Sequence, residues 1–240
     1  METSSFFENI LPLTQVRTRF PWFNKILRSI LLLSSGDPCP DVIGMASPKK
    51  LQLLNKAVAF LPKDGSECYL EVGTFQGKSL IAALLDNPGV MAVACDDFSQ
   101  FDDSVSPKNL ESLRKNIARY RLSEQVRYFN CDFRELLSSW QHHHFPPVGV
   151  YFYDGAHDEQ SQYLGIRLVE SLLADQAVVI VDDWRYADDS QSYAEAGTKR
   201  AIGQSKNKWS LEHVLPARFN GDLEQWWNGV AVLSFQRMDD

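Results

Sequence analysis

From residue 66 onwards, short apolar runs alternate with amphipathic stretches. Runs rich in β-branched or aromatic residues predict strands at 67–72, 90–95, 126–130, 148–153 and 177–181. Helix-compatible sequence follows each run, at 77–86, 106–120, 133–140, 158–173 and 190–204. Because parallel strands need a crossover connection between them, this repetition predicts an α/β fold: a doubly wound, Rossmann-like parallel sheet with helices on both faces.

The two ends of the chain depart from this repetition. Near the C-terminus, WSLEHVL and NGVAVLSF have no helical pattern between them and predict an antiparallel hairpin, which brings the sheet to seven strands. Before the sheet, residues 47–61 predict a helix with Ser47 as N-cap and Pro48 at the first helical position. We therefore expect an N-terminal helical extension at 1–65 and a main domain at 66–240.

The segment 11–36 is basic and amphipathic, and it contains no acidic residue. We expect it to form helical structure that covers the active site or makes a homodimer contact. A membrane surface is the weaker alternative for such a segment.

Composition narrows the class of partner and the compartment. The chain has 240 residues, 44% of them hydrophobic, and a formal net charge of -7, which disfavours a nucleic-acid binder because phosphate contacts need clustered Lys and Arg. No apolar run reaches the ~18 residues of a membrane span, and the first residues lack the basic start of a signal peptide. The four cysteines show no C-x-x-C spacing, so neither zinc nor a disulfide framework is implied. These features predict a cytoplasmic protein with a small-molecule partner.

A glycine-containing loop, LEVGTFQGKS at 70–79, follows the first predicted strand. A P-loop needs four residues between its first glycine and the Gly-Lys pair, whereas Gly73 and Gly77 are separated by three. A dinucleotide fingerprint needs a second glycine two residues after Gly73, where Phe75 stands. What remains is Glu71-x-Gly73-x-x-x-Gly77, a sharp strand-to-helix turn with a carboxylate at the strand end, which suits a cofactor that carries an amine.

Acidic residues also end the next two predicted strands. Asp96 ends the second strand, where a carboxylate can accept both hydroxyls of a ribose. Asp132 follows the third strand, within reach of an adenine amino group. With Glu71, these residues predict a nucleoside pocket without a phosphate cradle.

The ordered set of glycine loop and acidic strand ends resembles the class I S-adenosylmethionine-dependent methyltransferases, and the resemblance covers roughly residues 66–236. It implies strand order 3-2-1-4-5 followed by an antiparallel hairpin, in agreement with the pattern above. It also implies S-adenosylmethionine as cofactor, with the methionine part along the glycine loop, the ribose on Asp96 and the adenine near Asp132. The cofactor-binding set predicted in this way is Glu71, Gly73, Thr74, Phe75, Gly77, Ser79, Asp96, Asp132 and Asp154.

The second half of the chain refines this likeness. YFYDGAHDEQ and VVIVDDW look like the branch of macrocin-type sugar O-methyltransferases and, more distantly, catechol O-methyltransferase. The resemblance implies a divalent-cation site at Asp154, Asp182 and Asp183. Independently, adjacent parallel strands bring these carboxylates together, and an all-oxygen set favours Mg²⁺, with Mn²⁺ or Ca²⁺ as alternatives. The same residues could instead cap helices or bind loop amides.

His157 lies three residues after Asp154, where catechol O-methyltransferase has its basic lysine. An imidazole is a suitable general base near neutral pH, so His157 and Asp154 are the predicted catalytic residues. A loop hydrogen bond is the other interpretation of this histidine. The sequence thus predicts a metal-assisted O-methyltransferase that acts on a small diol-type acceptor, sugar or phenolic. A NAD-dependent oxidoreductase and a non-catalytic cofactor-binding protein remain as alternatives.

Overall fold

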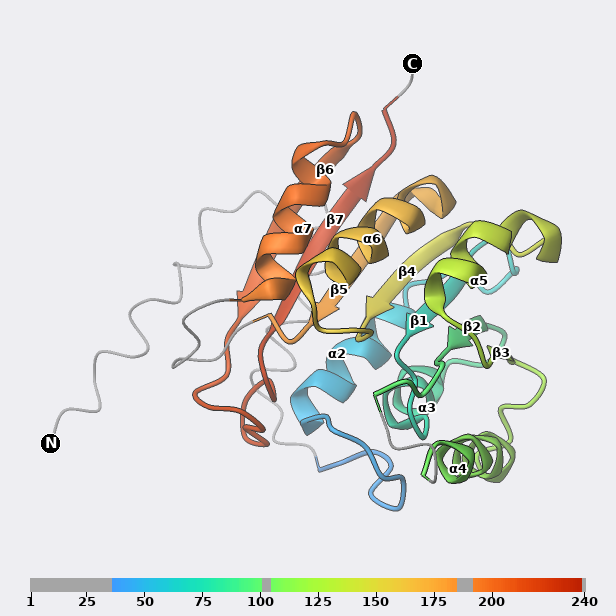
Figure 1. The fold of residues 1–240 in the computed structure, drawn as a ribbon. Coiled ribbons are helices and arrows are strands. Elements are labelled where there is room, and N and C mark those ends of the chain that lie inside the picture. Colours follow the sequence, from blue (N-terminus) through green and yellow to red (C-terminus); the bar gives the residue numbers. More distant parts are fainter. Residues whose placement is uncertain (1–35, 101–104, 185–191, 239–240) are drawn as a thin grey trace, which may run out of the picture.

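The computed structural model describes residues 36–100, 105–184 and 192–238. Within these ranges the chain forms one seven-stranded sheet of order β3-β2-β1-β4-β5-β7-β6 (Figure 1). Strands β1 to β5 pair in parallel, and β7 pairs antiparallel with both β5 and β6. The strands are β1 (Cys68–Val72), β2 (Met91–Cys95), β3 (Val126–Phe129), β4 (Val148–Tyr153), β5 (Leu173–Asp182), β6 (Lys208–Leu215) and β7 (Val230–Gln236). The predicted fold class, including its C-terminal hairpin, is confirmed.

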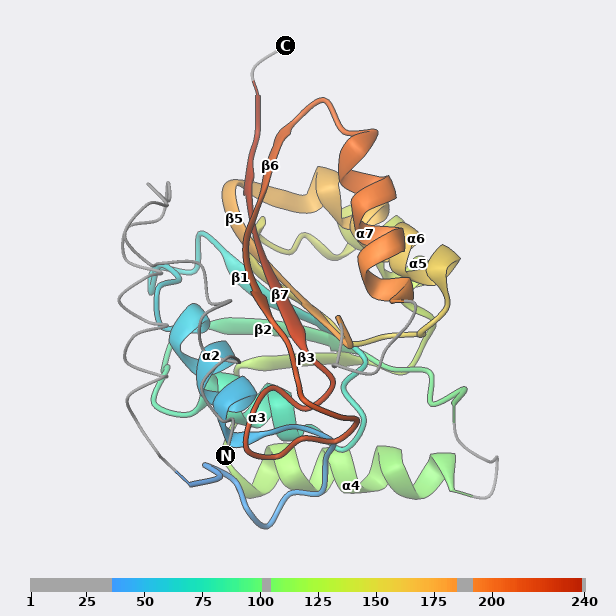
Figure 2. The same cartoon turned by 90° about the vertical axis from the view of Figure 1, so that its left-hand side faces the viewer.

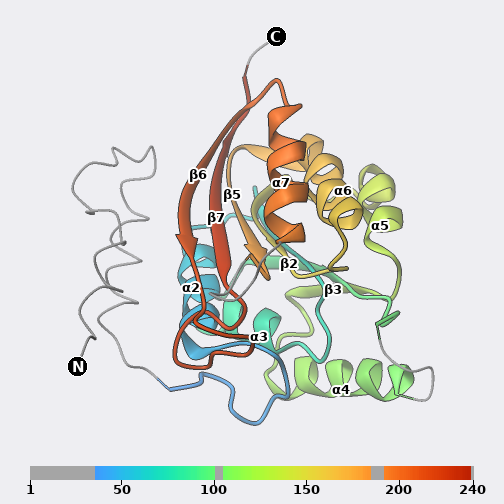
Figure 3. The same ribbon diagram turned by 60° about the vertical axis from the view of Figure 1, so that its left-hand side comes forward.

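Helices cover both faces of the sheet. One layer holds α2 (Pro48–Val58), α3 (Lys78–Leu84) and α4 (Ser106–Arg119), and the other holds α5 (Phe133–Ser139), α6 (Glu159–Val169) and α7 (Tyr193–Gly203). Figures 2 and 3 show the two layers on opposite sides of the twisted strands. Each layer encloses its own apolar cluster, as expected for strands whose side chains alternate between two buried faces.

The central strands β1 and β4 are buried along their whole length, which explains their continuous apolar runs. The fifth strand is longer than the predicted 177–181, because the buried Leu173 and Ala174 already belong to it. As a result α6 ends at Val169, and a short 3₁₀ turn (Glu170–Leu172) leads directly into β5, where the sequence predicted helix up to 173.

Helix α2 begins as predicted. Ser47 accepts a hydrogen bond from the backbone N–H of Lys50 at 3.3 Å, and Pro48 is the first helical residue. The apolar side of α2, including Leu51 and Leu54, belongs to the same buried cluster as strand residues of β1 and β4. The prediction for segment 11–36 concerns residues outside the described ranges, except for Gly36. No helix in the part of the chain that the structure describes is long and apolar enough to cross a membrane.

Candidate active site

A cavity lies at the carboxyl ends of the parallel strands. Residues that follow β1 to β5 line it, and the loop before β7 and the segment before α2 contribute further walls. Ligands of open α/β sheets bind at this edge, beside the point where the strand order reverses, here between β1 and β4. The cavity therefore has one half over β1, β2 and β3 and another over β4 and β5.

Gly73 and Gly77 shape the turn from β1 to α3. Gly73 has φ +87°, and a Cβ there would lie 1.8 Å from the backbone oxygen of Asp154. Any side chain would thus force β1 and β4 apart at the floor of the cavity. Gly77 has φ +90° as the residue before α3, and a Cβ there would lie 2.8 Å from Leu113 Cδ1. Both glycines are required by close approach as well as by backbone conformation.

Glu71 lies beneath this turn and is fully buried, and it is absent from the cavity lining. Its carboxylate accepts hydrogen bonds from the Tyr69 hydroxyl at 2.5 Å and from Ser79 Oγ at 2.8 Å. Burial raises the pKa of Glu71 to about 8. Ser79 does line the cavity, so Glu71 reaches the site through the hydroxyl it orients.

Asp96 stands at the end of β2 with both oxygens engaged by the backbone. Oδ2 accepts from the N–H of Phe75 and Oδ1 from the N–H of Phe98, each at 2.7 Å. Burial raises the pKa of Asp96, while these hydrogen bonds oppose the shift. Each carboxylate oxygen can accept a second hydrogen bond. The Asp96 carboxylate, although held by two backbone N–H groups, can therefore still accept hydrogen bonds from the hydroxyls of a ligand. Thr74 and Phe75 line the cavity beside it.

Asp132 has a helix-capping role in this structure. It precedes α5, accepts from the backbone N–H of Arg134 at 2.6 Å, and pairs with the Arg134 guanidinium at 2.7 Å. Both residues line the cavity. The predicted adenine contact would have to share this carboxylate with the cap, and it stays a prediction.

Asp154 and Asp182 stand side by side at the ends of strands β4 and β5; Asp182 is buried and Asp154 is half-buried. Burial, followed by the charge of Asp182, raises the pKa of Asp154 well above its ordinary value. Burial also raises the pKa of Asp182, although the ammonium of Lys50 works against this. Oδ2 of Asp182 contacts Lys50 Nζ directly, and Oδ1 has no hydrogen-bond partner among the described residues. Three carboxylates near one buried ammonium leave an excess of negative charge here.

Asp183 pairs with His157, whose Nε2 lies 2.8 Å from Asp183 Oδ2. This hydrogen bond raises the pKa of His157. Burial alone would raise the pKa of Asp183, but the contact with His157 and further bonds hold it below its ordinary value. Ligand atoms of Asp154, His157 and Asp183 all lie within 4.8 Å of one another. The structure thus brings three of the predicted residues together, Asp154, His157 and Asp183, whereas the predicted metal ligand Asp182 lies outside this group and contacts Lys50.

Sequence reasoning missed two residues of this site, Lys50 and Asn228. Lys50 lies on α2, 132 positions before the carboxylate that it contacts, and nothing in its local pattern distinguishes it from the surface lysines of that helix. Trp227 and Asn228 line the cavity from the loop before β7. The neighbouring Trp226 is buried in the core, as is Trp184, so of these three tryptophans Trp227 alone lines the cavity.

Comparison with known proteins identifies the family of the central segment. Residues 70–184, which include the glycine loop and all the acidic strand ends, match a family model described as a methyltransferase domain. Over this segment, a little under half of the chain, the protein is similar to a methyltransferase domain. The resemblance to the class I enzymes is thereby confirmed for this segment and for the strand order. No curated protein matches the chain.

Solved structures agree with the fold of the chain. An O-methyltransferase from Bacillus cereus in complex with SAH has 15% identity and a TM-score of 0.59, covering 93% of this chain and 94% of that one. TomG from Streptomyces achromogenes, an O-methyltransferase involved in tomaymycin synthesis and solved with SAM, has 17% identity and a TM-score of 0.59, covering 90% and 97%. SAH-bound PaMTH1 from Podospora anserina has 14% identity and a TM-score of 0.55, covering 93% and 98%. At these identities the likeness establishes the fold.

Proposed function

We propose that the protein is an S-adenosylmethionine-dependent O-methyltransferase that methylates a hydroxyl of a small diol-type acceptor, sugar or phenolic, with the help of a divalent cation. The proposal rests on one observation: the same cavity is lined on one side by the glycine turn and the carboxylate of Asp96, and on the other by the carboxylates of Asp154, Asp182 and Asp183 and the imidazole of His157. A cytoplasmic location and a homodimer are predictions that accompany it.

The half of the cavity over β1 to β3 suits a nucleoside with an attached amino acid. Gly73 leaves backbone without a side chain at the floor, and the Asp96 carboxylate is held by two backbone donors where ribose hydroxyls would approach. No Lys or Arg-rich phosphate cradle follows the turn, since the one lysine of the turn, Lys78, donates to Asp37 and to backbone oxygens before α2. These features support S-adenosylmethionine over a dinucleotide.

The half over β4 and β5 fits a divalent cation. Oδ1 of Asp182 is a buried acceptor without a partner among the described residues, and Asp154 carries a pKa raised by burial and by like charge. A shared proton or a bound cation would relieve both conditions. We assign the ion to Asp154, Asp182 and Asp183; of these, Asp154 and Asp183 offer oxygens that lie within 4.8 Å of each other and of a His157 nitrogen. An oxygen-rich set favours Mg²⁺ or Mn²⁺. When bound, such an ion supplies positive charge that lowers the pKa of an acceptor hydroxyl.

The protein's own residues then have defined tasks. S-adenosylmethionine supplies a methyl group on a positively charged sulfur, so little covalent help is needed beyond alignment of the acceptor oxygen. His157 directs its Nε2 to Asp183, which leaves Nδ1 to take the hydroxyl proton. Asp183 holds the ring and stabilises the imidazolium that results, because the ion pair favours the charged form.

Calorimetry and turnover test the proposal together. We expect S-adenosylhomocysteine (SAH), the demethylated product of the cofactor, to bind the purified protein. We also expect labelled methyl groups to pass from S-adenosylmethionine to a catechol or to a vicinal diol of a sugar. EDTA should suppress turnover while leaving SAH affinity unchanged, and Mg²⁺ or Mn²⁺ should restore it. Binding of NADH in place of SAH would favour the oxidoreductase alternative. SAH binding without transfer to any diol would favour a binding protein, and full turnover in EDTA would remove the metal from the mechanism.

A further inference from the structure

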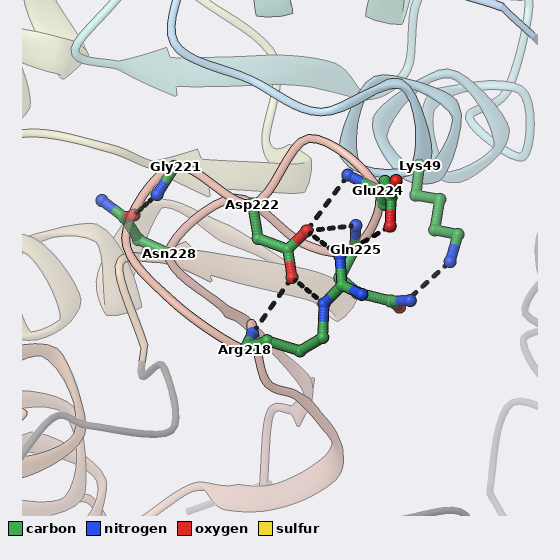
Figure 4. Close-up of polar contacts among 7 residues, drawn as sticks. All are labelled: Lys49, Arg218, Gly221, Asp222, Glu224, Gln225 and Asn228. Atoms are coloured by element: carbon green, nitrogen blue, oxygen red, sulfur yellow. Dashed lines mark hydrogen bonds and ion pairs between the residues drawn. The ribbon is translucent and has the colours of Figure 1, made fainter. Parts of the chain in front are cut away.

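The loop 216–229, which joins β6 to β7, is organised around one buried carboxylate. Asp222 is fully buried, and its two oxygens accept from Nε and Nη2 of Arg218, both at 2.8 Å (Figure 4). The backbone N–H groups of Arg218, Glu224 and Gln225 donate to the same carboxylate at 3.1 to 3.2 Å. Five donors on one carboxylate, two of them from a guanidinium fork, fix the course of a loop that belongs to no helix or strand.

The same loop is attached to the rest of the site at two further points. Lys49 of α2 donates to Gln225 at 3.0 Å, and Figures 2 and 3 show the loop beside the segment that precedes α2. Asn228 accepts from the N–H of Gly221 at 2.8 Å. Its side chain also helps to lower the pKa of the Asp183 carboxyl, so the loop acts on the carboxylate that holds His157.

This loop places Trp227 in the wall of the cavity. Its backbone exchanges two hydrogen bonds with Asp222, N–H to O at 3.0 Å and O to N–H at 3.1 Å. Its φ is +62°, a conformation that tryptophan adopts only when its surroundings impose it. Trp226 is buried in the core, whereas Trp227 is half-buried and lines the cavity together with Asn228 and Met45.

We propose that the Asp222–Arg218 pair makes loop 216–229 a rigid wall of the acceptor site, on which Trp227 receives the flat face of a ring-bearing diol. This inference rests on the proposed function and specifies its acceptor. An indole face packs on an aromatic ring and equally on the C–H face of a sugar ring, so the shared chemistry is a ring that carries vicinal oxygens. Trp227 is a specificity-determining residue, and Asp222 and Arg218 are positioning residues that act through it.

Fluorine NMR can follow Trp227 directly, because the chain has six tryptophans and Trp227→Phe assigns its resonance in protein labelled with 5-fluorotryptophan. SAH is added first, then Mg²⁺ with either catechol or methyl α-mannoside. We expect at least one diol to shift the Trp227 resonance, and the diol that does so identifies an aromatic or a sugar acceptor. Trp227→Ala should weaken binding of that diol about two- to tenfold, while Leu223→Ala, an exposed residue of the same loop, should not.

The positioning role has its own variants. Asp222→Asn keeps the shape of the side chain but loses the charge that holds Arg218, so the Trp227 resonance should move or broaden without any ligand present. Glu224→Gln is the matched control, because Glu224 meets the same guanidinium at 2.7 Å from the solvent side. SAH affinity should stay within twofold in both variants, because the half of the cavity over β1, β2 and β3, where we propose the cofactor, contains no residue of this loop.

The two proposals fail in different ways. If the parent protein binds no SAH, the methyltransferase function itself is contradicted. If SAH binds but neither diol moves the Trp227 resonance, or if Asp222→Asn leaves that resonance unchanged, the wall proposed here is overturned.

Discussion

Lys50→Met tests how much the fold depends on the buried pair between helix α2 and strand β5. Lys50 is 1% exposed and Asp182 2%, and their charged atoms are in direct contact. Methionine keeps the length and apolar stem of lysine, so the variant removes the charge with little change in packing. It leaves Asp182 buried beside Asp154 and Asp183 with its closest compensating charge gone.

The expected loss follows from two independent considerations. Removing one partner of a buried ion pair typically costs about 3–5 kcal/mol, because the other charge stays uncompensated. The loss also has an upper limit, since Asp182 can take up a proton instead. At pH 7 this neutralisation costs about 4 kcal/mol for a carboxyl of ordinary pKa, at 1.36 kcal/mol per unit. We therefore expect the free energy of unfolding to fall by about 3–4 kcal/mol.

The pH dependence of that loss has a definite sign. In Lys50→Met the folded-state pKa of Asp182 rises further above its unfolded value, so the penalty is present above the unfolded pKa and grows with pH. At pH 5 it should fall to about 1.5 kcal/mol, because protonation is cheaper there. Urea denaturation of the parent and the variant at both pH values measures this difference.

Two controls and a cation complete the test. Lys56→Met, on an exposed position of the same helix, should change stability by less than about 0.5 kcal/mol. Asp182→Asn in the Lys50→Met background should recover most of the loss. If Asp154, Asp182 and Asp183 hold a divalent ion, saturating Mn²⁺ should stabilise Lys50→Met more than the parent, by mass action. A loss that is below 1 kcal/mol and independent of pH would refute the reasoning.

Three further predictions concern the rest of the site. Asp96→Ala should weaken SAH binding at least tenfold in calorimetry, because each hydrogen bond to a charged group contributes about 1.5–3 kcal/mol. Unchanged affinity would remove Asp96 from the ribose site. Gly73→Ala should lower Tm and abolish SAH binding, since its Cβ would lie 1.8 Å from the backbone oxygen of Asp154, and a crystal structure with an undisturbed β4 would contradict this. For His157, the rate should rise with pH through its raised pKa, because only the neutral ring accepts a proton. In a pH–rate profile, His157→Ala should lose this rise of the rate with pH. Asp183→Asn should move the rise to lower pH. A rise that is unaltered in both variants would exclude His157 as base.

The half of the cavity over β1, β2 and β3, where we propose the cofactor, has sequence signals that are local. The turn at Gly73 needs a positive φ, and Asp96 directly ends an apolar strand, so pattern and chemistry coincide within a few residues. Even here the structure adds what spacing could not show: Glu71 is withdrawn from the cavity and acts on Ser79. The sequence identified the carboxylate at the strand end but could not tell which way its side chain pointed.

The acceptor half could be predicted only in part, because its contacts are long-range. Asp154, Asp182 and Asp183 follow from parallel topology, which brings strand ends together whatever the loops do. Lys50 and Asn228 reach the same place through the packing of α2 and through the carboxylate bonds of loop 216–229. These interactions join residues far apart in the sequence or depend on backbone geometry that no periodicity encodes.

Charge balance ties Lys50 to the proposed cation. With all three carboxylates ionised and Lys50 protonated, the cluster carries a net charge of about -2, which a buried site cannot retain without compensation. Without a metal, protonation would supply this compensation, and the pKa shifts have the matching direction: burial and like charge raise the pKa of Asp154, and the Asp183 contact raises the pKa of His157. One divalent ion would supply the same two charges and would leave His157 free to lose its proton and act as a base. Lys50 therefore offsets one of the three negative charges, and a single divalent cation would balance the two that remain.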